Sequence, residues 1–129
     1  MSDVEPISWR CEICRGQIAD GEGGIYADIV AADRVRRDRL KWDAEVRPTA
    51  TIADFLNRPK SVDWHAVHAR CHPDPDTASY LIEVDQLRSP WDILSMTSYL
   101  MGKTWLESTN WSILIGGLAR DHVAKVPPT

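Results

Sequence analysis

Residues 64–72 read WHAVHARCH, and residues 11–14 read CEIC. Each stretch contains two side chains that can ligate a metal, separated by two residues: Cys11 and Cys14 in one, His68 and Cys71 in the other. This spacing lets the chain turn tightly enough for both side chains to reach one ion. Three thiolates and one imidazole form a common closed ligand set for zinc, and soft sulfur ligands favour zinc over calcium or magnesium. The sequence therefore predicts one structural Zn²⁺ ion at these four residues.

Two other histidines compete for the fourth ligand position. If residues 61–68 form a strand, its alternation puts His65 and His68 on opposite faces. His72 directly follows Cys71, which gives a poor chelate geometry. The sequence thus favours His68 and leaves His72 as the second choice.

The 53 residues between Cys14 and His68 form a long insertion, but the entropic cost of closing a loop grows only logarithmically with its length.

Composition limits the classes of protein to which the chain can belong. The chain has 129 residues, of which 43% are hydrophobic, which is enough for one domain with its own core. We expect a single domain over residues 1–126, with a zinc-binding core at 9–75, a strand and two helices at 76–123, and a frayed tail at 127–129. The net charge of −4 argues against a general nucleic-acid coat. With neither a long apolar run nor a signal-peptide pattern, the prediction is a cytoplasmic protein without a membrane partner.

The predicted fold class is α+β. Glycines at 21, 23 and 24, followed by the apolar run IYADIV at 25–30, indicate a β-hairpin after the first cysteine pair rather than a phosphate-binding loop. Residues 31–46 predict a long insertion helix, and SYLIEV at 79–84 predicts a second strand.

Two amphipathic helices are predicted near the C-terminus. Ser89, Pro90 and Asp92 form a helix start signal, and the helix that follows should end near Gly102. The expected buried residues of this helix are Trp91, Leu94, Thr97 or Ser98, and Met101. The last helix lies within residues 107–123, is capped by Ser108 or Thr109, and carries an apolar stripe of Trp111, Leu114, Ile115 and Leu118.

Two further sets of residues are candidates for binding. The insertion helix carries the basic side chains Arg34, Arg36, Arg37, Arg39 and Lys41, which either face phosphates or form a solvated, salt-bridged helix surface. Trp105 and Leu106, between the two C-terminal helices, are either an exposed protein-binding anchor or part of the core.

At the ligand pairs the chain resembles the treble-clef class of zinc modules, which includes LIM-like domains. CEICRGQI resembles the knuckle of that class, and WHAVHARC resembles its second ligand pair. The resemblance covers about residues 9–75 and implies a metal scaffold in which the knuckle leads into a β-hairpin. Taken whole, the chain is also similar to small proteins of actinobacteria and their phages, through the segment SYLIEVDQLRSPWDILSMTSYLMGKTWL.

Scaffolds of this class serve protein binding, DNA binding and, in HNH-type nucleases, catalysis. The leading expectation is a non-enzymatic, regulatory protein-interaction module with a protein partner, host-directed if phage-encoded, and without a small-molecule substrate. The alternative is a nucleic-acid-binding regulator that uses the basic helix at 34–41. A nuclease is a third reading, for which only His65 and His72 could supply a second metal site.

Overall fold

The computed structural model describes residues 6–73 and 79–125, with side chains of the last helix described to residue 118. These described residues form a three-stranded sheet and four α-helices, consistent with the predicted α+β class. The strands are Gly23–Asp28 (β1), His65–His68 (β2) and Ser79–Glu83 (β3). The helices are Ile29–Glu45 (α1), Ile52–Leu56 (α2), Pro90–Leu100 (α3) and Trp111–Lys125 (α4). Short 3₁₀ turns occupy Arg47–Thr49, Ala69–Cys71, Val84–Gln86 and Leu106–Ser108.

The sheet has the order β2-β1-β3, and both pairings are antiparallel. The central strand β1 therefore pairs with segments that lie far away in the sequence. Among the described residues, the segment before β1 contributes only the isolated bridge between Arg10 and Gln17. The β-hairpin predicted for the N-terminal block is thus a tight loop around the cysteine pair, and β1 belongs to the larger sheet.

Two glycines allow β1 to approach both of its neighbours closely. A Cβ atom on Gly24 would overlap the carbonyl oxygen of Ile82, and a Cβ atom on Gly23 would overlap that of Val67. Gly21, with φ of 80°, lies in the turn before the strand. The glycine-rich stretch is therefore a turn followed by a close-packed strand end.

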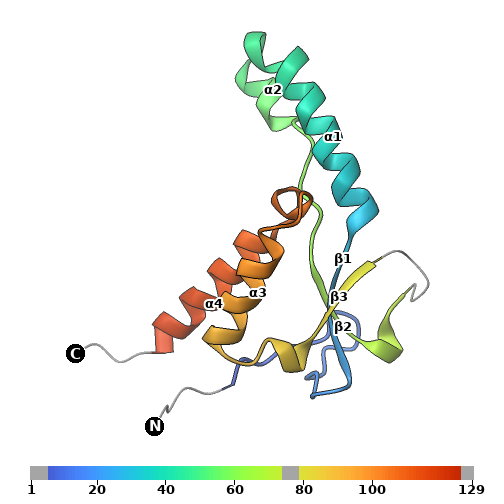
Figure 1. The fold of residues 1–129 in the computed structure, drawn as a ribbon, viewed down its shortest axis with the longest axis vertical. Coiled ribbons are helices and arrows are strands. Elements are labelled where there is room, and N and C mark those ends of the chain that lie inside the picture. Colours follow the sequence, from blue (N-terminus) through green and yellow to red (C-terminus); the bar gives the residue numbers. More distant parts are fainter. Residues whose placement is uncertain (1–5, 74–78, 126–129) are drawn as a thin grey trace.

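Helix α1 begins at Ile29, two residues earlier than predicted, because Asp28 caps it. The Asp28 Oδ1 atom accepts a hydrogen bond from the Ala31 N–H at 3.0 Å. From β1 the helix runs away from the sheet, and α2 folds back beside it (Figure 1). The rings of Trp42 and Phe55 meet edge to face with centroids 5.1 Å apart, which holds the two helices together.

The core lies between the sheet and the pair α3 and α4, with Trp64 at its centre. The Trp64 ring contacts Tyr80, Trp105 and Trp111 with centroid distances of 5.3 to 6.3 Å. Its indole Nε1–H donates a hydrogen bond to Thr109 Oγ1 at 3.0 Å. Burial of so large a side chain is favourable here because its one polar group is paired.

Helix α3 starts where the sequence predicts. The Ser89 hydroxyl accepts a hydrogen bond from the Asp92 N–H at 3.1 Å, and the Asp92 carboxylate accepts one from the Ser89 N–H at 3.1 Å. This reciprocal capping box, with Pro90 as the first helical residue, satisfies backbone donors that the helix start leaves unpaired.

The predicted buried face of α3 is wrong except at Thr97, which is partly buried. Three of its expected core residues are exposed: Trp91, Leu94 and Met101. The residues that face the core instead are Ile93, Met96 and Leu100. The helix is apolar on two sides, so periodicity alone did not decide which side packs inward. The indole of Trp111 on α4 fixes the rotation by donating a hydrogen bond to Thr97 Oγ1 at 3.0 Å.

Helix α4 buries the predicted stripe and begins at Trp111. Trp111 is buried, and Leu114, Ile115 and Leu118 pack against the core. Residues 106–108 form a separate 3₁₀ turn, and the Thr109 hydroxyl accepts a hydrogen bond from the Trp111 N–H at 3.3 Å. The tail at 127–129 lies outside the described residues. No helix in the described part of the chain is both long and apolar enough to cross a membrane.

Candidate metal centre

The first ligand pair lies in a tight loop at residues 11–16. The Arg15 N–H donates to the Cys11 carbonyl oxygen at 3.0 Å, and the Cys11 N–H donates to the Gly16 carbonyl oxygen at 2.9 Å. Arg15 adopts the left-handed conformation with φ of 68°, a position that glycine usually fills. Gly16 does not have a positive φ, so Arg15 alone takes the left-handed position of this loop. A Cβ atom on Gly16 would meet Cys14 Sγ and His68 Cε1 at ordinary contact distances of 3.5 and 3.6 Å.

The second ligand pair spans the end of β2 and the 3₁₀ turn Ala69–Cys71. The Ala69 N–H donates to the Glu22 carbonyl oxygen at 2.9 Å, which fixes the start of this turn against the segment before β1. His68 is buried and Cys71 is half-buried. Pairing of β1 with β2 thus brings the second pair to the first, although the two are far apart in the chain.

The structure brings all four predicted ligands together. One ligand atom from each of Cys11, Cys14, His68 and Cys71 lies within 4.8 Å of every other. In tetrahedral zinc sites, ligand atoms at about 2.0 to 2.3 Å from the metal lie roughly 3.3 to 3.8 Å apart. The four atoms therefore need only a small contraction to hold a metal ion. The three cysteines are free thiols, not disulfides.

His68 presents the correct nitrogen to the sulfur atoms. Its Nδ1 atom lies 3.2 Å from Cys14 Sγ, while Nε2 lies 3.0 Å from the carbonyl oxygen of Gln17. Because a carbonyl can only accept, Nε2 carries the proton and donates, which leaves the Nδ1 lone pair directed at the cluster. Metal-binding histidines are commonly oriented by such a second hydrogen bond. This contact with Gln17 also raises the pKa of His68.

Backbone N–H groups are directed at the sulfur of Cys11. Burial raises the pKa of the Cys11 thiol, but hydrogen bonds from the backbone of Cys14, His68 and Ile13 outweigh it, and the pKa falls to about 6. The His68 N–H lies 3.4 Å from this sulfur. The backbone N–H of Gly16 likewise lowers the pKa of Cys14. Such donors stabilise thiolates, the form that binds metal.

Cys71 differs from the other two cysteines. Burial raises the pKa of its thiol, and the neighbouring sulfur atoms of Cys11 and Cys14 raise it further. Arg70 interacts with the sulfur atoms of Cys71 and Cys14, and these contacts raise the pKa of Arg70. Three thiolates and one neutral imidazole around Zn²⁺ carry a net charge of −1, so a guanidinium beside them offsets this charge.

The two competing histidines lie outside the cluster. His65 Nδ1 is 2.8 Å from the Glu12 carboxylate at the surface, and the His72 ring packs against Tyr26 with centroids 4.2 Å apart and the ring planes tilted by 34°. The predicted choice of His68 over His72 agrees with this geometry. Within residues 6–73 and 79–125, no second group of three or more histidine, cysteine or acidic residues gathers its ligand atoms as closely.

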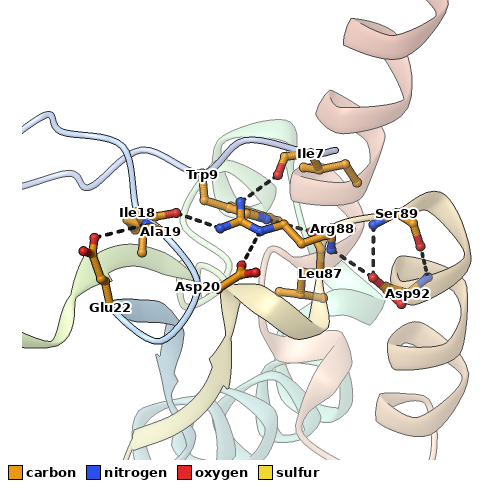
Figure 2. Close-up of polar contacts among 10 residues, drawn as sticks. All are labelled: Ile7, Trp9, Ile18, Ala19, Asp20, Glu22, Leu87, Arg88, Ser89 and Asp92. Atoms are coloured by element: carbon orange, nitrogen blue, oxygen red, sulfur yellow. Dashed lines mark hydrogen bonds and ion pairs between the residues drawn. The ribbon is translucent and has the colours of Figure 1, made fainter. Parts of the chain in front are cut away.

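An arginine that the sequence did not single out ties the metal loop, defined as residues 7–20 around the first cysteine pair, to the helix pair. The Arg88 guanidinium donates to the carbonyl oxygens of Ile7 and Ile18, at 2.9 and 2.8 Å, and pairs with Asp20 at 2.8 Å (Figure 2). Beside it, the Trp9 indole donates to the Leu87 carbonyl oxygen at 2.9 Å. No spacing rule reveals such a residue, because its partners are mostly backbone carbonyls about 70 to 80 positions away.

The basic residues of α1 do not form one free surface. Arg36 and Arg37 both pair with Asp33, at 3.0 and 3.3 Å. Arg39 donates to the carbonyl oxygens of Pro59 and Glu107 and to the Ser61 hydroxyl, so it holds α1 against the returning chain. The other two members of the set are exposed: Arg34 and Lys41.

Trp105 and Leu106 are both partly buried and pack against the core. The Trp105 ring contacts those of Tyr80 and Trp64, with centroids 5.2 and 6.1 Å apart. This placement favours the core role over the exposed-anchor role for Trp105.

No protein-family model, curated protein or solved structure significantly matches the chain. The assignment of the centre is therefore based on its own geometry.

Proposed function

We propose that this chain is a zinc-stabilised, non-enzymatic protein-interaction module built on a treble-clef-like centre. The observation that carries the proposal is the closed donor set: one ligand atom from each of three cysteines and His68 lies within 4.8 Å of every other, and His68 Nδ1 is 3.2 Å from Cys14 Sγ. Structural zinc sites are four-coordinate with protein ligands alone, whereas catalytic zinc sites keep one position for water or substrate. Zinc bound here would supply cross-linking of the two segments, and the fold would present its surfaces to a partner.

Cobalt substitution tests the closed site. Co²⁺ bound by three thiolates and an imidazole in tetrahedral geometry should give intense visible bands and a thiolate-to-metal charge-transfer band. Added azide or excess imidazole should leave these bands unchanged, because no coordination position is open. A spectrum that shifts with added ligand would contradict a closed structural site and favour a catalytic one. The matched control is Cys71→Ser, which removes one of the four ligands and should give none of these intense bands.

The nucleic-acid alternative has weaker support. Arg39 holds α1 against the returning chain, and Arg36 and Arg37 are paired with Asp33. Of the predicted basic set this leaves Arg34 and Lys41 for phosphates. A fluorescence-anisotropy titration with duplex DNA at two salt concentrations distinguishes the readings. Tight binding that weakens steeply with salt would favour the alternative, and a flat titration favours the protein-binding module.

A further inference from the structure

Helix α3 carries a second apolar face that the fold does not bury. Trp91 and Leu94 of the helix are 76% and 59% exposed, and Met101, the residue that caps its C-terminal end, is 72% exposed. With Ser98 between the last two, these positions follow the spacing of three, four and three residues that is typical of a helix-packing seam. The helix has a single charged side chain, Asp92, and its carboxylate is engaged in the helix cap.

An apolar groove of about 560 Å³ lies next to this face, between α3 and α4. Leu94 belongs both to the exposed face and to the groove wall, and Ile115 and Gly116 of α4 line the other side. Gly116 contributes no side chain to this wall of the groove. All the described residues that line the groove are uncharged.

We propose that this surface, Trp91, Leu94, Met101 and the adjoining groove, binds the same surface of a second copy of the chain. In a dimer with a twofold axis the same patch of each copy must contain both the side chains that protrude and the groove that receives them. The exposed face of α3 and its adjoining groove meet this requirement. Leu94 or Trp91 of each copy would enter the groove of the other. The inference rests on the proposed function, since it names one partner of the interaction module.

Charge and area both favour a second copy. The chain carries a net charge of −4, so association through a charged face would bring like charges together, whereas this face is uncharged. The three exposed side chains present on the order of 400 Å² of apolar surface. Roughly that amount of apolar area lies on one side of a standard interface, which buries about 800 Å² per partner.

Sedimentation equilibrium over a range of concentrations up to about 300 µM tests the proposal with the full-length chain. We expect a monomer–dimer equilibrium for the wild type and a dimerisation constant weakened at least about thirtyfold by Leu94→Glu, since the charge would be buried in the interface. The matched control is Ile52→Glu, which places the same charge at a residue 83% exposed on α2 and should change the constant less than about twofold.

A second variant, Trp91→Ser, guards against misfolding of Leu94→Glu, and circular dichroism checks that both variants are folded. The proposal would be overturned if the wild type stayed monomeric at the highest concentration, or if both α3 variants still formed dimers. Binding of a different protein in the groove would not rescue it in either case. Zinc content measured on the same samples separates the two proposals. A zinc-containing monomer overturns the dimer alone, and a metal-free dimer overturns the zinc module alone.

Discussion

At the scale of single residues, His68 and His65 show how neighbouring histidines acquire different roles. Both belong to β2, but the alternation of the strand buries His68 next to the cysteines and leaves His65 at the surface beside Glu12. The two-residue spacing of each ligand pair is a local signal, which is why the site could be predicted from the sequence. The hydrogen bond from His68 to the Gln17 carbonyl oxygen could not be predicted, because it depends on the path of the chain after the first cysteine pair.

The two histidines provide a matched pair of substitutions. His68→Ala should abolish stoichiometric metal binding and lower the melting temperature by about 10 °C, since a lost ligand leaves the three thiols without their ion. His65→Ala should bind metal normally and melt within about 2 °C of the wild type, because it loses only a surface contact. The metal content and the thermal unfolding of each variant are measured and compared with those of the wild type. Equal effects of the two substitutions would contradict the assignment of His68 as the ligand.

The end of β1 gives a second prediction at this scale. Gly24→Ala should destabilise the protein by about 1 to 3 kcal/mol, because the new Cβ atom would overlap the Ile82 carbonyl oxygen and push β3 away. Gly102→Ala, whose Cβ would stand at an ordinary 3.5 Å from the Tyr99 carbonyl oxygen, is the control and should change stability much less. Urea unfolding of both variants measures the change in stability. If Gly24→Ala left the stability unchanged, β1 and β3 would not be so closely packed.

At the scale of elements, the start of α3 was predicted correctly from the sequence, but its buried face was not. The Ser89-Pro90 start signal is local, and the structure has the capping box that it predicts. The buried face of α3 was predicted wrongly because Trp91 and Leu94 compete with Ile93 and Met96 for the core, and only the position of α4 decides between them. A helix with two apolar faces leaves the choice to tertiary packing.

Arg88 connects elements that the sequence does not relate. Arg88→Lys should destabilise the protein by about 1 to 3 kcal/mol, because an ammonium group cannot replace the planar fork that reaches the carbonyl oxygens of Ile7 and Ile18. Arg37→Lys, at a mostly exposed side chain paired with Asp33, should cost less than about 0.5 kcal/mol. Chemical unfolding tests the difference, and indistinguishable midpoints would argue against a structural role for Arg88.

At the scale of the whole molecule, the four ligands connect the N-terminal loop to the middle of the chain across the insertion that contains α1 and α2 (Figure 1). The α1 and α2 part of this insertion extends away from the sheet, so its length does not disturb the centre. Arg88 then links the metal loop to the start of α3. Loss of the metal should therefore loosen more than the loop itself, because the sheet and the helix pair are both connected to it.

The most direct test of this account is the metal content of protein purified without chelators, measured by elemental mass spectrometry together with the Cys14→Ser and Cys71→Ser variants. The account predicts about one zinc ion per wild-type chain, and loss of both stoichiometric zinc and thermal stability in each variant. A wild-type protein without stoichiometric metal, or variants that melt like the wild type, would contradict it.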